Sequence, residues 1–231
     1  MLNFAETDFK IMTHLIVTAT KFEAGEIISE LNLKQVSENI FNGNNKTHLL
    51  ISGVGVHTTI FELTKFLNNN KVDLIINTGI AGAFKNTAKI TETFLIKSDY
   101  FGDLGYYDNN RFINIFNSDF NKQYSRLFTE GKLILDNNIP DYFQKLSTAH
   151  AITVNIPENI SQPENVFIES MEGAAVMMCA KLFNTKCVQI RAVSNIIGET
   201  PRNKWKIKEA IKNYSEIINE YINLTNKSQT T

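Results

Sequence analysis

The sequence predicts an α/β domain built around a largely parallel, buried sheet. Short, dense apolar runs alternate with longer segments of helical period, the pattern of strands that are covered by helices. With 231 residues, 43% of them hydrophobic, the chain can bury a sizeable core, and folding should hide roughly 70% or more of the unfolded chain's surface. We therefore expect one domain over residues 12–225, with flexible tails at residues 1–11 and 226–231.

The expected strands are short runs of aliphatic and β-branched residues. They are His14–Ala19, Thr47–Ser52, Val72–Asn77, Thr93–Ser98, Val166–Glu169 and Cys187–Ser194. The stretch from Gly102 to Thr129 is polar, aromatic and irregular, and we expect it to leave the sheet as an excursion.

Two internal segments, Val56–Phe66 and Glu172–Phe183, have helical period. The second places Ala175, Met178 and Leu182 on one stripe, which we interpret as packing against the core. A third helix is expected over Asn203–Leu224, where apolar residues recur at spacings of three and four. These residues are Ile207, Ile211, Tyr214, Ile218 and Tyr221.

The charge balance excludes several classes of partner. The chain has 23 Lys and Arg against 24 Asp and Glu, a net charge of -1, which gives no electrostatic reason to expect nucleic acid or a membrane surface. Cys179 and Cys187 match neither a metal pair nor a redox pair, and we expect two reduced, mostly buried thiols. Residues 1–11 carry charges that do not suit a secretory signal, and no apolar run is long enough to span a bilayer, so we expect a cytoplasmic location.

Two glycine-bearing segments each follow an expected strand. In Ser52–Thr58 the third glycine of a dinucleotide-binding fingerprint is replaced by Thr58, so a Rossmann cofactor site is not expected. In Asn77–Phe84 the small residues would let a flat ligand approach the backbone, although a tight turn is the simpler interpretation of this segment alone.

Three polar residues also stand at the ends of expected strands. Glu23 follows the first strand, Glu172 follows Val166–Glu169, and Asn195 ends the last strand. Each has a structural explanation when considered alone, such as a helix-start carboxylate favoured by the helix dipole. If the strands are parallel, however, these residues and Ile80 share the carboxyl edge of one sheet, where open α/β sheets bind ligands.

Four motifs in order along the chain carry a family resemblance. They are VTATKFE (Val17–Glu23), INTGIAGAF (Ile76–Phe84), ESMEGAA (Glu169–Ala175) and QIRAVSN (Gln189–Asn195). Together they resemble the superfamily of purine nucleoside phosphorylases and methylthioadenosine/S-adenosylhomocysteine nucleosidases. Within it, FGDLG at Phe101–Gly105, Asn195 after Ser194, and the sequence from Pro201 to Trp205 are most similar to the futalosine hydrolase branch. The likeness runs from about Met12 to Tyr214.

The resemblance implies a three-layer αβα fold with a mixed, largely parallel sheet, and an enzyme that breaks the bond between ribose and a purine base. Glu23 would activate water, and Glu172 would bind the ribose hydroxyls with Met171 packed against the sugar. Gly79, Ile80, Ala81 and Gly82 would form a wall beside the sugar and base, and the loop at Val154 and Asn155 would cover the base. The implied reaction has an oxocarbenium-like transition state.

Asn195 decides which base is expected. Adenine-specific relatives have an Asp at the matching position, which can protonate the leaving base, whereas an amide cannot. The Asn amide can donate to a 6-oxo group while its carbonyl accepts from a protonated ring nitrogen. The resemblance therefore implies hypoxanthine as the base, futalosine as the nucleoside and menaquinone biosynthesis as the pathway.

Water is the expected nucleophile. The related phosphorylases bind phosphate with arginines, usually including one from an early glycine-rich loop, but no arginine of this chain precedes Arg111. The role of Arg191 stays open between structural pairing and support of the site. The histidines, including His57, show no metal spacing, so neither a metal nor a cofactor is expected.

Three alternatives stay open: a nucleosidase for another purine nucleoside, such as methylthioadenosine or S-adenosylhomocysteine, a purine nucleoside phosphorylase, and a nucleoside-binding protein without activity. The family likeness also implies a homo-oligomer, a dimer or larger. The aromatic stretch from Tyr100 to Phe120 could cover a neighbour's pocket.

Overall fold

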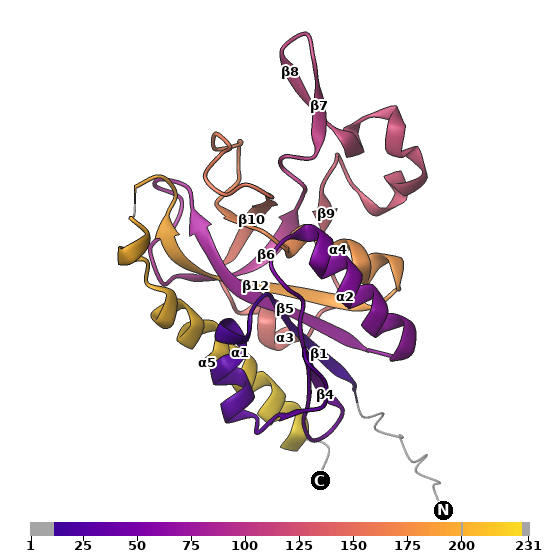
Figure 1. Ribbon diagram of the computed structural model, residues 1–231, viewed down its shortest axis with the longest axis vertical. Helices are drawn as coiled ribbons and strands as arrows, with labels where there is room; N and C mark the ends of the chain where they lie inside the picture. Colours follow the sequence, from indigo (N-terminus) through magenta and orange to yellow (C-terminus); the bar gives the residue numbers. More distant parts are fainter. Residues whose placement is uncertain (1–11, 200, 228–231) are drawn as a thin grey trace, which may run out of the picture.

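In the computed structural model, which describes residues 12–199 and 201–227, a mixed sheet runs through the middle of the chain (Figure 1). Its strands lie in the order β11-β10-β6-β12-β5-β1-β4-β3-β2, and β9 pairs with β6. Their bounds are β1 His14–Thr18, β2 Lys34–Gln35, β3 Ile40–Asn42, β4 Thr47–Ile51, β5 Leu74–Ala83, β6 Thr93–Asp99, β9 Leu133–Ile134, β10 Thr148–Thr153, β11 Ile168–Ser170 and β12 Lys186–Ile196.

The sheet has two halves that run in opposite directions. Strands β4, β1, β5 and β12 run parallel to one another in one half, and β6, β10 and β11 run parallel to one another in the other. The halves meet at the antiparallel pair β12–β6, and β11 then returns to pair antiparallel with the end of β5, where Glu169 lies opposite Gly82. Strands β5, β12, β6, β10 and β11 therefore pair in a closed ring. The expected mixed, largely parallel sheet is confirmed.

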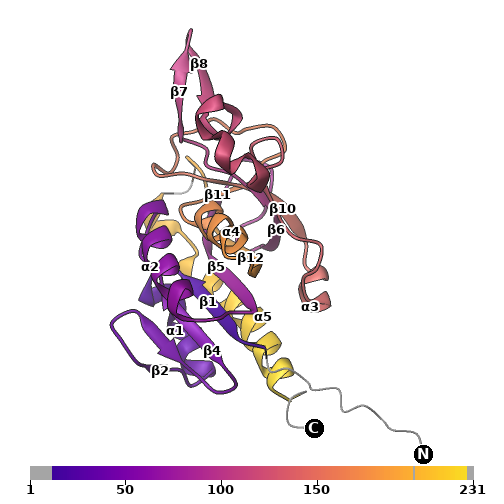
Figure 2. The same ribbon diagram turned by 90° about the vertical axis from the view of Figure 1, so that its right-hand side faces the viewer.

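Helices cover both faces of the sheet, which gives the three-layer arrangement (Figure 2). Helices α1 (Lys21–Glu30) and α5 (Ile207–Lys227) pack on one face, and α2 (Val56–Asn69) and α4 (Gly173–Leu182) on the other. Because side chains alternate along a strand, Ile16 contributes to the core under α1 and α5, whereas Leu15 and Val17 contribute to the core under α2 and α4. The short helix α3 (Asp141–Gln144) adds Phe143 to the first of these cores.

Helix α5 follows the predicted apolar stripe. Ile211, Tyr214, Ile218 and Tyr221 are buried, and Ile207 is partly buried. The helix begins later than expected because the residues before it form a 3₁₀ turn, η3 (Arg202–Lys204). It ends later too, so residues 226 and 227 belong to the helix and not to a tail, while residues 1–11 and 228–231 lie outside the described residues.

The stripe expected on α4 is only partly right. Ala175 is buried and Met178 partly so, but Leu182 is 41% exposed. The buried residues of α4 are mostly small and lie on several sides of its first two turns: Gly173, Ala174, Ala175, Val176, Met177, Cys179 and Ala180. Tight packing on several sides, and not one amphipathic stripe, therefore holds α4 in place.

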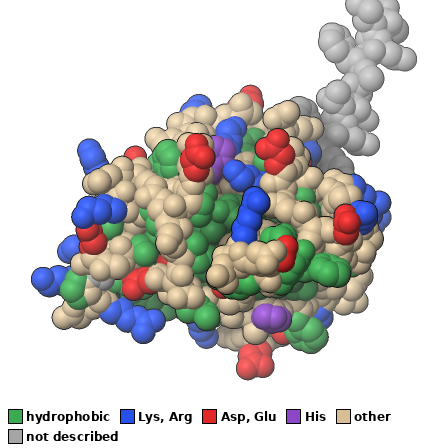
Figure 3. Space-filling view, turned by 90° about the horizontal axis from the view of Figure 1, so that it is seen from above, with side chains coloured by type: hydrophobic (Ala, Val, Ile, Leu, Met, Phe, Trp, Pro, Cys, Tyr) green, Lys and Arg blue, Asp and Glu red, His purple; other side chains and the backbone are tan. Residues whose placement is uncertain are grey.

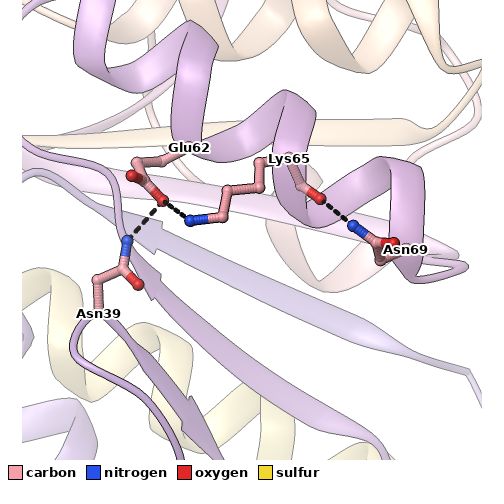
Figure 4. A network of polar contacts seen from close by, with 4 residues as sticks. All are labelled: Asn39, Glu62, Lys65 and Asn69. Carbon is pink, nitrogen blue, oxygen red and sulfur yellow. Dashed lines mark hydrogen bonds and ion pairs between the residues drawn. The ribbon is translucent and has the colours of Figure 1, made fainter.

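Polar contacts tie the outer side of α2 to the loop that precedes β3 (Figure 4). The side-chain amide of Asn39 donates to Glu62 at 2.7 Å, and Lys65 approaches the same carboxylate at 3.9 Å. At the last turn of the helix, Asn69 donates to the Lys65 carbonyl at 2.8 Å. This bond satisfies one of the carbonyls that a helix leaves unpaired at its C-terminus.

Strand β5 is longer than predicted, and the tight turn expected within Asn77–Phe84 is wrong. The residues from Gly79 to Gly82 continue the strand, because β12 pairs with them along their whole length. Neither glycine has a positive φ. Small side chains are needed here for close approach and not for turning the chain.

The stretch from Gly102 to Thr129 leaves the sheet as expected and projects at the top of Figure 1. It contains the hairpin of β7 (Gly105–Asp108) and β8 (Arg111–Asn114), followed by the 3₁₀ turns η1 (Ile115–Asn117) and η2 (Asp119–Leu127). Among the described residues, no helix has both the length and the apolar character that crossing a membrane requires.

Candidate active site

A pocket of about 730 Å³ opens beside the pairing of β11 with the end of β5, and Gly82 and Glu169 of that pairing both line it. Its size falls within the roughly 300–1,000 Å³ of small-molecule sites. Of the predicted site residues, all except Gly79 and Asn155 line it: Glu23, Ile80, Ala81, Gly82, Val154, Met171, Glu172 and Asn195. The expected shared carboxyl edge needs one correction, because Glu172 follows β11, which runs antiparallel to β5. The ring of strands, not a uniformly parallel edge, brings Glu172 to the other residues.

Glu23 is fixed by its position in the first turn of α1. Thr20 caps this helix, and its backbone amide and hydroxyl donate to Glu23 Oε2 at 3.1 and 2.9 Å. The other oxygen, Oε1, accepts from the Ile80 amide at 3.2 Å. The Tyr214 hydroxyl of α5 donates to the Glu23 carbonyl at 2.7 Å. Side chain and backbone are both held, so the carboxylate has a defined direction at the pocket wall.

Gly79 provides the space in which Glu23 and Arg191 approach each other. A Cβ at Gly79 would lie 2.5 Å from Arg191 Nη1 and 2.8 Å from Glu23 Oε1. The small residue therefore makes room for two side chains of the protein itself. Arg191 is 1% exposed and donates to Asn77 Oδ1 at 3.3 Å. Arg191 therefore both pairs with a neighbouring strand and places its charge near Glu23 and Glu172.

Glu172 occupies the N-cap position of α4 but does not cap the helix with its side chain. Its Oε1 accepts instead from the Gly55 amide at 2.8 Å. Gly55 has a φ of 90°, a conformation that favours glycine, and this turns its amide toward the carboxylate. Burial raises the pKa of Glu172 above its ordinary value, while the charge of Arg191 and the Gly55 amide oppose that rise. Glu172 is thus a buried carboxylate facing the pocket.

The cap that Glu172 does not supply comes from β10. Thr153 Oγ1 accepts from the Ala174 amide at 2.8 Å and donates to Asp99 Oδ1 at 2.9 Å. Gln189 donates to the other Asp99 oxygen at 2.9 Å. Burial raises the pKa of Asp99 to about 6, although these hydrogen bonds and the charge of Arg191 oppose the rise. The Thr153 hydroxyl therefore caps the N-terminus of α4, and the side chain of Glu172 can face the pocket instead.

Replacing Gly173 with alanine tests this packing. Helix propensity alone would favour alanine at the first residue of α4 by up to about 1 kcal/mol. A Cβ here, however, would lie 2.1 Å from Gln189 Nε2 and 2.2 Å from Asp99 Oδ2. Because overpacking costs about 1–3 kcal/mol, we expect Gly173→Ala to lower the melting temperature. The control is Gly25→Ala in α1, where nothing lies within 4 Å of the new Cβ; thermal unfolding of both variants decides, and equal melting temperatures would contradict the packing argument.

Asn195 is 2% exposed and lies opposite Gly82 in the pairing of β12 with β5. The Ser194 hydroxyl donates to Asn195 Oδ1 at 2.8 Å. The Nδ2 atom lies 3.3 Å from the point where a Cβ of Gly82 would be, at the pocket wall. A hydrogen-bonding amide with a fixed orientation therefore stands at this end of the pocket.

Asn155 does not lie where the sequence placed it. Its backbone amide donates to Asp103 Oδ2 at 2.6 Å and its side chain to Oδ1 at 2.9 Å. Both donors are thus used by the FGDLG segment, and the residue is exposed outside the pocket. Val154 alone of this pair lines the pocket.

Sequence reasoning missed an aromatic and basic wall of the pocket. It is formed by Phe22, Arg202, Trp205 and Ile207 from the start of α1 and the segment that leads into α5. In the sequence, Pro201–Trp205 served only as a sign of family resemblance, although the single tryptophan of the chain in this polar stretch could have indicated a place in the site. Among the described residues, no group of three or more His, Cys, Asp or Glu side chains is arranged to hold a metal ion.

Comparison with known proteins supports one family. The sequence profile of the phosphorylase superfamily matches residues 13–223. A 5′-methylthioadenosine/S-adenosylhomocysteine nucleosidase from Bacillus pumilus is 27% identical over 167 residues, which cover 65% of this chain and 68% of the relative.

Solved structures share the fold. That of the Streptococcus pneumoniae MTA/SAH nucleosidase in complex with 8-aminoadenine has a TM-score of 0.73 at 19% identity, covering 91% of this chain and 99% of that one. The 5′-methylthioadenosine/S-adenosylhomocysteine nucleosidase from Neisseria meningitidis, in complex with methylthio-immucillin-A, has a TM-score of 0.70 at 18% identity, covering 91% and 98%. At sequence identities this low, the similarity to these structures shows a shared fold and nothing more.

Proposed function

The chain belongs to the phosphorylase superfamily, and on this premise we propose that it is a purine nucleosidase, which uses water to break the bond between ribose and a purine. The observation that carries the proposal is the convergence of two buried carboxylates, Glu23 and Glu172, in one pocket with the amide of Asn195. Its relative in Bacillus pumilus is named as a nucleosidase, which supports the same reaction.

The two carboxylates have different roles at the ribose: Glu23 activates water and Glu172 binds the hydroxyls. Breaking the ribosyl bond builds positive charge on the ribose, as in glycoside hydrolysis, so an anionic group nearby lowers the barrier. Glu23, oriented by Thr20 and Ile80, takes a proton from the attacking water. Glu172 accepts from the ribose hydroxyls, with Met171 against the sugar. The charge of Arg191 lowers the pKa of Glu172 and so favours its ionised form, in opposition to the effect of burial.

At the base, Asn195 favours a 6-oxopurine and hence futalosine, with hypoxanthine and dehypoxanthinyl futalosine as products. The Nδ2 group donates to the 6-oxo oxygen, and Oδ1 accepts from a protonated ring nitrogen. An aspartate would instead turn lone pairs toward the oxo group. Asn195 is buried, so an unmatched partner would cost about 1–3 kcal/mol.

A second candidate is a methylthioadenosine/S-adenosylhomocysteine nucleosidase, because that is the printed activity of the Bacillus pumilus relative. It is at least as well supported by relatives as futalosine hydrolysis, which rests on Asn195 and on the resemblance of the motifs. A phosphorylase is a third candidate, and it would require inorganic phosphate and yield ribose 1-phosphate.

One assay separates these candidates. Purified protein is incubated in phosphate-free buffer with futalosine, inosine or methylthioadenosine, and the released base is measured by chromatography. We expect free hypoxanthine from futalosine without added phosphate. Adenine from methylthioadenosine with no hypoxanthine from futalosine would identify the second candidate, and a requirement for phosphate would identify the third.

The pH dependence of this reaction should reveal Glu172. Only the carboxylate form accepts two hydroxyl donors, and burial raises its pKa, so kcat/KM should fall as the pH drops through that raised pKa. The loss should therefore begin at a higher pH than an ordinary glutamate would give. In Glu172→Gln, kcat/KM should be lower by about 10- to 100-fold, from about 1.5–3 kcal/mol of charged hydrogen bonding, and this part of the pH profile should change. An identical acidic limb in the variant would contradict the assignment.

We also propose a homo-oligomer, for which the excursion offers a surface. Tyr107 and Phe120 are 76% and 70% exposed, and apolar side chains lie among charged ones on the face seen from above (Figure 3). Monomeric proteins rarely expose large apolar patches. Light scattering at working concentration should give a mass above the 26.2 kDa of one chain, and a 26.2 kDa particle would refute the proposal.

A further inference from the structure

Arg202 is a charged residue of the pocket to which the proposed reaction gives no role. Of the described residues that line the pocket, it alone carries a fixed positive charge. The other charged groups in the lining are glutamates. Arg202 is itself exposed, so a ligand that enters the pocket can reach its guanidinium.

Four of the five glutamates in the lining have other partners, and the fifth, Glu158, is exposed. Glu23 and Glu172 accept the backbone bonds described above. Glu199 pairs with Lys85 at 2.5 Å, and Glu169 accepts from the Glu158 amide at 2.9 Å. Among the described residues, no carboxylate lies within ion-pair distance of Arg202. Within the described residues, no ion pair therefore competes with a ligand for the five N–H donors of this guanidinium.

The guanidinium has an aromatic support. Its central carbon lies 5.8 Å from the centroid of the Trp205 ring, close enough for a cation–π contact. The two residues belong to the same short turn, since the Trp205 amide donates to the Arg202 carbonyl at 3.3 Å. The turn is anchored to β12, because the Lys206 amide donates to the Ser194 carbonyl at 2.8 Å. Phe22, 60% exposed, adds a second ring to this wall of the pocket.

We propose that Arg202 and Trp205 form a subsite for a carboxylate carried beyond the 5′ carbon of the nucleoside. This inference rests on the proposed function, which assigns the base to Asn195 and the ribose hydroxyls to Glu172. The remaining direction in which a ribosyl purine can extend is its 5′ side. A guanidinium fork matches the two oxygens of a carboxylate, and the aromatic wall suits an apolar or aromatic arm that carries it.

The subsite would select among purine nucleosides. Futalosine carries an aromatic carboxylate on its 5′ side, whereas inosine ends in a hydroxyl and methylthioadenosine in a neutral thioether. A subsite for the acid therefore favours futalosine over inosine, although both contain hypoxanthine. Comparing futalosine with inosine therefore measures how much the 5′ substituent adds to binding, because the purine base is the same in both.

The test compares Arg202→Gln with Lys204→Gln, a neighbouring exposed lysine of the same turn that does not line the pocket. We expect Arg202→Gln to raise KM for futalosine by roughly tenfold or more while changing that for inosine by less than about twofold. Arg202→Lys should restore part of the difference, because it keeps the charge and loses the fork. Lys204→Gln should change neither KM. The preference for futalosine should also weaken as salt is added.

Binding measured by calorimetry in a Glu23→Gln background removes any dependence on turnover. Tighter binding of futalosine than of inosine, lost with Arg202→Gln, supports the subsite. Equal loss for both nucleosides, or no loss, overturns it while leaving the nucleosidase proposal intact. Failure of both nucleosides to bind or react overturns the subsite together with the assignment of futalosine as the substrate. A phosphate-stimulated reaction that disappears in Arg202→Gln would assign the arginine to inorganic phosphate and overturn the carboxylate subsite.

Discussion

Glu23→Gln should lower kcat for nucleoside cleavage by about 10²–10⁴-fold, the usual contribution of a general base. The amide has nearly the same shape but cannot take a proton from water. It can still accept one of the bonds that Thr20 and Ile80 donate to the carboxylate. Initial rates of hypoxanthine release, with the nucleoside affinity measured by calorimetry, test this expectation.

The matched control is Glu26→Gln, which lies on the same helix, is exposed and does not line the pocket. It should leave kcat unchanged. Retained affinity with lost turnover in Glu23→Gln would separate an enzyme from a protein that only binds nucleosides. Full activity in Glu23→Gln would remove this residue from the mechanism.

Asn195→Asp should reverse the preference for the base. An ionised aspartate would face the lone pairs of a 6-oxo group, and burial makes this mismatch cost about 1–3 kcal/mol per unmatched group, so hypoxanthine release should fall on the order of 10- to 100-fold. A protonated aspartate could instead donate to the ring nitrogen of a leaving adenine. Adenine release from methylthioadenosine should therefore rise relative to hypoxanthine release from futalosine.

The control for this exchange is Asn223→Asp, which introduces the same charge on the exposed side of α5. It should alter neither rate. Chromatography of both bases from mixed substrates gives the ratio in a single experiment. An unchanged ratio in Asn195→Asp would show that the base is chosen by other residues.

The fold could be predicted largely from local pattern. Dense apolar runs predict buried strands such as β1 and β4, and the recurrence of apolar residues every three to four positions predicts α5. The extension of β5 through Gly79 and Gly82 could not be predicted in this way, because glycine has no side chain to show a strand period. What keeps these residues extended is their pairing with β12, which lies more than a hundred residues later.

The candidate site was predicted in its residues more than in its geometry. Glu23 and Glu172 follow expected strands and Asn195 ends one, so their sequence positions already placed them near a sheet edge. The direction of β11 depends on long-range pairing, and the partner of Glu172 is a backbone amide at Gly55, which leaves no side-chain signal. Asn155 was misplaced for a similar reason, since its partner Asp103 lies in the irregular excursion.

The bond from the Tyr214 hydroxyl to the Glu23 carbonyl joins residues 191 positions apart. As a chain emerges from the ribosome, the segment that contains Glu23 is made long before the helix that contains Tyr214. Glu23, the proposed general base, can therefore take up its final position only after α5 has been synthesised and has docked against α1. Nucleoside binding during synthesis would thus report the completion of the fold and not the appearance of its first half.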